Sequence, residues 1–159
     1  MYEITCRLAV MAALLVSSCA VLASAVLASS PELDRPMQFR IAYNGGNCST
    51  CTWIAAQGTI TPDTHLAFET FLVREGMPDA RGLNIHINSP GGNLFGGVRL
   101  GTAIRNSGAN TIVSASHGNI QPNGWLSVTE SSYDTVAVCA SACAFAFAGP
   151  LGQGSCRLI

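Results

Sequence analysis

The chain has 159 residues, of which 11 % are charged and 48 % are hydrophobic, and its formal net charge is -1. This balance gives no electrostatic attraction to nucleic acid or to acidic partners. Lysine is absent, because all eight basic residues are arginine. A Ser–Lys pair, a Schiff-base lysine and a lysine-containing phosphate loop are therefore excluded.

The most hydrophobic stretch lies near the N-terminus, where residues 8–28 carry no charge. Arg7 precedes it, and Ala23-Ser24-Ala25 offers a small-residue cleavage site, a pattern typical of an export signal. The stretch is also long enough to span a bilayer as an uncleaved anchor. We therefore expect an exported protein, periplasmic or anchored to the membrane facing the periplasm. Its expected parts are a hydrophobic helix that is a signal peptide or membrane anchor (1–28), a linker (29–37) and one domain (38–159).

Residue patterns in the remainder predict strands that alternate with helices. The NGGN turn at 44–47 separates the first two strands, and a capping threonine followed by proline begins the first helix. Strands are predicted at 38–43, 52–60, 83–88, 111–115 and 135–139, helices at 61–76, 93–107 and 141–147, and a loop at 116–133. This order predicts an α/β fold with largely parallel strand pairing.

Two consecutive glycines follow the predicted strand at 83–88. In the sequence INSPGGNLFGG, Gly91 and Gly92 allow a sharp backbone turn that leaves amide N–H groups exposed at the start of a helix. Such N–H groups suit a developing oxyanion. An ordinary strand-to-helix turn would look the same, so this motif alone does not identify a site.

A serine at the start of the last predicted helix forms the second candidate motif. In CASAC, Ser141 follows a strand and has small residues on both sides, which a sharp strand–nucleophile–helix turn requires. The N–H of Ala142 would be free in the first helical turn and could complete an oxyanion hole. A serine in this position is more often only a helix N-cap.

Together, in this order, the two motifs resemble the Clp protease proteolytic subunit and its exported relatives in the crotonase-like superfamily. The resemblance covers residues 52–149, and INSPGG is its most specific part. It implies a fold of repeated β-β-α units and a serine-type peptidase or hydrolase. By the resemblance, Ser141 attacks an acyl carbonyl, and Gly91 or Gly92 and Ala142 donate backbone N–H groups to the oxyanion.

The catalytic base of that family is missing from its usual place. There, a histidine follows the serine and an acid lies further on, whereas no His, Asp or Glu follows Ser141 here. We expect a chain cut short before the base, so that the C-terminal part of the domain is missing and activity is weak or absent. His117, in the predicted loop, is the one internal alternative, because the order of triad residues is not fixed across folds. His86 is expected to be structural or exposed on the opposite sheet face, and His65 is expected on the surface.

The cysteines are candidates for disulfides rather than for a metal site. Cys48 and Cys51 precede a strand pattern rather than a helix, unlike a thioredoxin-type redox pair. Cys139 and Cys143 flank Ser141 and are expected to form a bridge, or to lie close as thiols, that pins its turn. An oxidising periplasm permits a bridge within each pair and leaves Cys156 over. No metal and no cofactor is expected.

Three classes of function are compatible with these features. The first is an exported serine peptidase or hydrolase that acts on a peptide or protein substrate. The second is a non-catalytic relative that binds peptides or forms homo-oligomers through the same surface. The third is a crotonase-type acyl-CoA enzyme, which the export signal disfavours because CoA substrates are cytosolic. Contact with a membrane is expected only through the N-terminal segment, and no nucleic-acid partner is expected.

Overall fold

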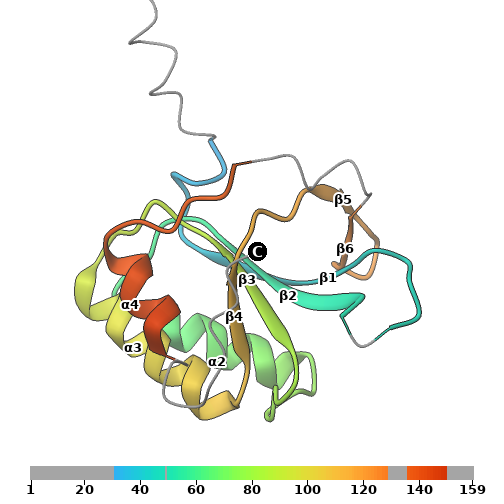
Figure 1. Ribbon diagram of the computed structural model, residues 1–159, viewed down its shortest axis with the longest axis horizontal. Helices are drawn as coiled ribbons and strands as arrows, with labels where there is room; N and C mark the ends of the chain where they lie inside the picture. Colours follow the sequence, from blue (N-terminus) through green and yellow to red (C-terminus); the bar gives the residue numbers. More distant parts are fainter. Residues whose placement is uncertain (1–30, 49, 129–135, 150–159) are drawn as a thin grey trace, which may run out of the picture. The chain divides into compact units, whose positions relative to one another are not determined.

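The computed structural model describes residues 31–48, 50–128 and 136–149. They form a mixed α/β fold in which one six-stranded sheet has the order β4-β3-β2-β1-β6-β5 (Figure 1). The hydrophobic helix expected within residues 1–28, and Cys156, lie outside the described residues. The strands are β1 (Gln38–Tyr43), β2 (Thr52–Gln57), β3 (Asn84–Asn88), β4 (Asn110–Val113), β5 (Gly118–Ile120) and β6 (Leu126–Val128).

The strand pairing is more mixed than the sequence predicts. β2, β3 and β4 are parallel, and β6 is parallel to β1, but β1–β2 and β5–β6 are antiparallel. The antiparallel β1–β2 pair follows from the short NGGN connection, because parallel strands need a long crossover. The parallel part, β2-β3-β4, carries the strand ends that lead toward the candidate site.

Three helices cover one face of the sheet, as the ribbon shows (Figure 1). The helices are α2 (Thr64–Arg74), α3 (Leu94–Ser107) and α4 (Ala142–Ala148). α2 begins three residues later than predicted. α3 ends at Ser107 as predicted, and Gly108 follows it in the left-handed conformation with φ 74°. Asn93 caps α3, since its side chain accepts a hydrogen bond from the Gly96 N–H at 2.8 Å. Within the described residues, no helix is long and apolar enough to cross a membrane.

Alternating residues of the strands form two apolar layers. On the helix side, strand residues such as Ile54, Ile85 and Ile87 pack with Phe68 and Ile104 of the helices, and all five are fully buried. The other face carries a smaller cluster of Ala42, Trp53, Ala55, Leu126 and Val128. The central strand β2 therefore reads as a continuous apolar run from Trp53 to Ala56, which is expected where both sheet faces are covered.

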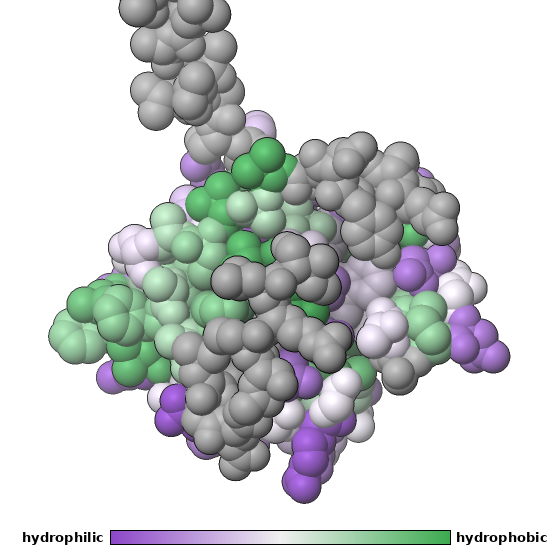
Figure 2. Space-filling view, viewed as in Figure 1, coloured by the Kyte–Doolittle hydropathy of each residue, from purple (hydrophilic) through white to green (hydrophobic). Residues whose placement is uncertain are grey.

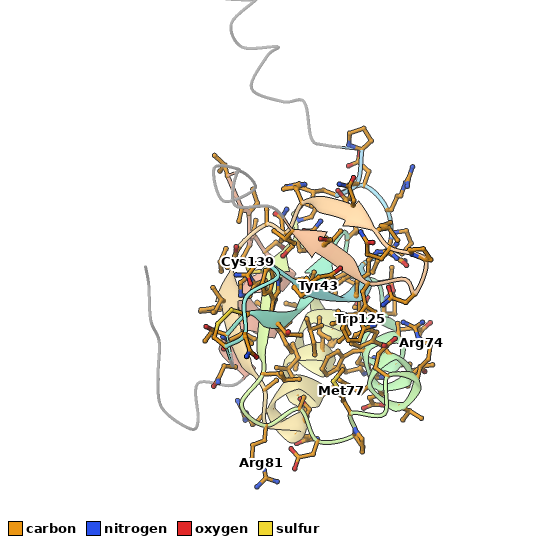
Figure 3. The ribbon with its side chains drawn as sticks, turned by 90° about the vertical axis from the view of Figure 1, so that its right-hand side faces the viewer. Tyr43, Arg74, Met77, Arg81, Trp125 and Cys139 are labelled. Atoms are coloured by element: carbon orange, nitrogen blue, oxygen red, sulfur yellow. A yellow bond between two sulfur atoms is a disulfide. The ribbon has the colours of Figure 1, made fainter. Side chains whose placement is uncertain are left out.

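Two predictions for the last third of the chain were wrong. The loop predicted at 116–133 contains the β5–β6 hairpin, and β6 extends the sheet beside β1. Tyr43 and Trp125 lie edge to face at 6.1 Å between ring centroids where the hairpin meets β1 (Figure 3). The strand predicted at 135–139 is reduced, among its described residues, to a single parallel bridge between Ser89 and Cys139. Pro90 follows Ser89 and has no N–H to donate, so the pairing between the two segments does not continue into a longer strand.

α3 and α4 pack closely because α3 presents glycines to α4. A Cβ on Gly97 would collide with the carbonyl oxygen of Ala142, and a Cβ on Gly101 would lie 2.6 Å from that of Phe145. Real Cβ atoms do not approach other atoms so closely, so these positions of α3 cannot carry a larger side chain without moving α4. The start of α4, and Ser141 with it, is thereby fixed against α3.

Candidate functional site

Ser141 occupies a strained turn between an extended segment and α4. Its dihedral angles are φ 53° and ψ -120°, and it is the only non-glycine residue with positive φ in the part of the chain that the structure describes. An L-residue in such a conformation costs about 1–3 kcal/mol, so the surroundings must hold it there. Strain of this kind gathers at functional sites, and a nucleophile elbow is one example.

The Ser141 hydroxyl does not serve as an ordinary helix cap. Ser141 immediately precedes α4, yet its side chain makes no capping hydrogen bond. The residue is exposed to solvent, while Ala142 and Cys143 behind it are fully buried. The simplest structural explanation for a serine at this position, an N-cap, therefore does not apply.

The Gly91 turn lies directly against Ser141. A Cβ built on Gly91 would lie 2.5 Å from the Ala140 carbonyl oxygen and 2.9 Å from the Ser141 Cβ. Gly91 has φ 101°, in the region that L side chains rarely adopt. Only glycine fits here, so the two motifs singled out in the sequence meet in space.

Gly92 has a different neighbour from Gly91. A Cβ on Gly92 would collide with the Ile60 carbonyl oxygen, and the Asn93 N–H donates to that oxygen at 2.8 Å. Gly92 therefore joins the turn to Ile60 in the segment that follows β2, while Gly91 faces the serine. The two predicted glycines therefore have different contacts: Gly92 packs against Ile60, and Gly91 packs against the Ser141 turn.

Backbone hydrogen bonds fasten the segment before Ser141 to the end of β3. The Ser89 N–H donates to the Val138 carbonyl at 2.6 Å, and the Ala140 N–H donates to the Ser89 carbonyl at 3.2 Å. The buried Asn88 side chain contributes as well, because its Oδ1 accepts the Val138 N–H at 3.0 Å. Sequence reasoning missed this role of Asn88, although a polar residue at a buried strand position just before the turn was a signal for it.

A disulfide closes a short ring around the serine. Cys139 and Cys143 are bonded, with their Cα atoms 5.1 Å apart, so that Ser141 is the middle residue of the ring. Cys143 is fully buried in the core, and Cys139 packs against that core. The bond therefore ties the segment before Ser141 to the first turn of α4.

The far end of α4 is held by side chains from two other elements. Thr111 Oγ1 on β4 donates to the Phe147 carbonyl at 3.1 Å, and Arg105 Nε on α3 donates to the Gly149 carbonyl. Carbonyl groups at a helix C-terminus lack partners within the helix, so these donors satisfy them. α4 is fixed at both ends although it is only seven residues long.

The predicted oxyanion donors differ in their present hydrogen bonds. The Gly91 N–H donates to Ser89 Oγ at 3.1 Å within the turn. For the N–H groups of Gly92 and Ala142 there is no acceptor among the described residues, and Ala142 is the first residue of its helix. Ala142 and Gly92 thus have N–H groups available, whereas Gly91 would first have to release Ser89.

The structure does not bring a histidine to Ser141. His117 leads into β5, which lies at the opposite edge of the sheet order from β4 and two places beyond β1. No hydrogen bond between described residues joins His117, His86 or His65 to Ser141. His65 was expected on the surface, but its Nδ1 is buried without a partner among the described residues.

His86 lies on the sheet face opposite the helices. Its ring stacks on Trp53, with centroids 4.9 Å apart and planes 20° apart, and the Trp53 Nε1–H donates to Ser116 Oγ at 2.9 Å. The Ser116 N–H donates in turn to Gln57 Oε1 at 2.7 Å, so hydrogen bonds connect Trp53, Ser116 and Gln57 on this sheet face. Burial lowers the pKa of the His86 imidazole to about 4, so the ring is neutral in the folded protein at neutral pH.

We expect the fold to lose stability as the pH falls from about 6.5 toward 4. The unfolded chain binds a proton on His86 below its ordinary pKa, while the folded chain does not, so the unfolded state gains stability in this window. The loss should reach at most about 3 kcal/mol. Urea unfolding at pH 7.5 and at pH 4.5 will measure it. A His86→Phe variant, which retains a ring over Trp53, should lose most of this pH dependence, and an undiminished dependence would contradict the assignment.

The second disulfide joins Cys48 to Cys51 in the β1–β2 connection, away from the serine turn. Cys51 is buried and Cys48 is exposed. In the described ranges, no group of three or more His, Cys, Asp or Glu side chains is placed to hold a metal ion.

Comparison of the chain with protein-family models, with curated proteins and with solved structures finds no match in any of the three.

Proposed function

We propose that this chain is an exported serine hydrolase-like protein of the Clp-protease type, with a crotonase-like fold and Ser141 as its nucleophile. The observation that carries the proposal is the strained conformation of Ser141, an exposed residue with φ 53° that opens α4 without capping it. A serine serving only as a cap gains nothing from this strain. A nucleophile does, because the strain projects its hydroxyl outward from a rigid turn.

In the proposed reaction, the Ser141 Oγ attacks the carbonyl carbon of an acyl substrate and gives its proton to solvent water. Negative charge then develops on the carbonyl oxygen, and preorganised backbone N–H groups would stabilise it. Ala142 and Gly92 are the proposed donors, since their N–H groups have no acceptor among the described residues. Gly91 lies directly against the Ser141 turn, and its N–H would become a further donor to the oxyanion once its hydrogen bond to Ser89 Oγ is broken. The alcohol or amine of the substrate then leaves with a proton, and a water molecule hydrolyses the acyl-enzyme to release the acid and restore the serine.

Turnover should be slow, because among the described residues no base is hydrogen-bonded to Ser141 to take its proton. A general base contributes roughly 10²- to 10⁴-fold, and the oxyanion donors alone leave only residual catalysis. None of the histidines in the described ranges is hydrogen-bonded to Ser141. The proposal is therefore a formed nucleophile and oxyanion site with weak hydrolytic activity.

Hydrolysis of an activated ester and of a peptide by the purified chain tests this function. We expect weak ester hydrolysis that disappears in Ser141→Ala and survives in His117→Ala. A robust activity that is lost in both variants would identify a Ser–His pair and refute the expectation that no histidine acts as the base for Ser141. Ester hydrolysis unchanged in Ser141→Ala would remove Ser141 from any catalytic role.

Peptide binding without catalysis is the second candidate, and the segment before Ser141 favours it. The Val138 backbone and the Ala140 N–H form hydrogen bonds toward Asn88 and Ser89, so the backbone groups of Ala137 and Cys139 point to the other side of this extended segment. An extended peptide could pair with that free edge as an added strand. Peptide affinity that is equal in the parent and in Ser141→Ala, without hydrolysis in either, would support this candidate.

A further inference from the structure

Exposed apolar side chains gather on the two helices that begin at the Gly91 and Ser141 turns. Phe95 is 74 % exposed and Phe145 is 51 % exposed, and Figure 2 shows hydrophobic residues over α3, α4 and the segment that leads into α4. We call the exposed large hydrophobic residues of these helices the apolar patch: Leu94, Phe95, Val98 and Phe145. Val136 and Val138, which are also exposed, extend it along the segment before Ser141.

The members of the apolar patch lie on adjoining surfaces. Leu94 and Val98 are one helical turn apart on α3, and Phe95 is three residues from Val98. α4 lies against α3 at Gly97 and Gly101, which brings Phe145 beside the same helix. The patch is therefore one surface built from two helices, rather than four scattered side chains.

The full charges on α3 and α4 are exclusively positive. The sequence has no Asp or Glu from residue 80 to residue 128 or from 136 to 149, so the only full charges on α3 and α4 are Arg99 and Arg105. Both arginines are exposed on α3. Aromatic and aliphatic side chains with neighbouring arginines match the chemistry of a bilayer interface with anionic headgroups.

We propose that the apolar patch docks on the surface of a lipid bilayer that contains anionic lipid. The same chain carries the uncharged apolar stretch at 8–28, joined to β1 by the short segment 29–37. A stretch of this length that is retained in the bilayer holds the domain beside the membrane surface, where the patch contacts the interface. A second copy is the less fitting occupant, because a two-fold contact would bring Arg99 and Arg105 of both copies together. The proposal does not depend on whether Ser141 is a nucleophile.

Tryptophan reporters on the full-length chain test the docking. Phe95→Trp places the reporter in the patch, and Val73→Trp places it on α2 at a position of matching exposure, 73 %. Each variant is reconstituted in vesicles of phosphatidylcholine and phosphatidylglycerol whose acyl chains are brominated. The signal of the parent chain, which contains Trp53 and Trp125, is subtracted.

We expect bromine to quench the Phe95 reporter several-fold more strongly than the Val73 reporter. Replacing phosphatidylglycerol by phosphatidylcholine should reduce that difference, because the arginines lose their anionic partners. Equal quenching of the two reporters, or none, would overturn the proposal, since tethering through the N-terminal stretch alone cannot distinguish α3 from α2. A concentration-dependent blue shift of the Phe95 reporter without vesicles would also overturn it, in favour of a second copy.

Discussion

Replacement of Gly91 by alanine should slow the reaction of Ser141 by at least about tenfold and destabilise the fold by about 3 kcal/mol. The new methyl group would lie 2.5 Å from the Ala140 carbonyl oxygen, in a backbone conformation with φ 101°. The only escape is to push the Ser141 turn away, which relaxes the strained serine. We expect at least a tenfold slower reaction of Ser141 with a fluorophosphonate, together with a lower free energy of unfolding in urea.

Gly82→Ala is the matched control for this effect. Gly82 also has positive φ, at 84°, but nothing lies within 4 Å of its Cβ position. The substitution should therefore cost only the backbone term, about 1–2 kcal/mol, and leave the reaction of Ser141 unchanged. If Gly91→Ala reacted as fast as the parent, the Gly91 turn would not hold the serine in place.

Removal of the Cys139–Cys143 disulfide should also slow the reaction of Ser141 by tenfold or more. The bond closes a five-residue ring with Ser141 at its centre, and without it the turn can relax out of the φ 53° conformation. Loss of the bond should cost about 2 kcal/mol through the freed denatured chain. The measurement is the fluorophosphonate rate and the urea stability of a double Cys139→Ala, Cys143→Ala variant.

Removal of the second disulfide is the control that separates an effect on Ser141 reactivity from an effect on the free energy of unfolding. The Cys48–Cys51 ring is almost the same size, so Cys48→Ala with Cys51→Ala should cost a similar free energy of unfolding. It lies in the β1–β2 connection, however, and should leave the reaction of Ser141 unaltered. Equal slowing in both double variants would mean that global destabilisation, and not the ring around Ser141, sets the reactivity.

Much of the fold could be predicted from the sequence because local signals and tertiary packing agree. The strand β3 and the helix α3 are marked by apolar spacing, by the capping Asn93 and by the terminating Gly108, and the structure has them where those signals lie. The β5–β6 hairpin escaped prediction because its strands have three residues each, and Gly118 and Asn119 are typical of turns. A strand of three residues is too short to show alternation.

The meeting of the two glycine- and serine-containing turns was predictable, but its detailed geometry was not. The Gly91 turn follows β3 directly, and the segment before Ser141 pairs with Ser89 just past the end of β3. Both turns therefore lie at the carboxyl ends of the parallel strands. The positive φ of Ser141 occurs where Gly91, the disulfide and the hydrogen bonds to Ser89 meet, and these come from separate parts of the chain. The contribution of Asn88 was not predicted because its side-chain oxygen accepts a hydrogen bond from Val138, a residue 50 positions later in the sequence.

The most direct test of the central claim is site-resolved labelling of the oxidised full-length chain with a fluorophosphonate, followed by peptide mapping in a mass spectrometer. We expect to find the phosphonyl group on Ser141, added at a slow but saturable rate, and no label on the Ser141→Ala variant. The exposed hydroxyl of Thr102 on α3, which donates to the Val98 carbonyl in an unstrained helix, serves as an internal control and should stay unmodified. Absence of label on Ser141 in the folded, disulfide-bonded protein, or equal labelling of Thr102, would contradict the claim that this turn is a nucleophile site.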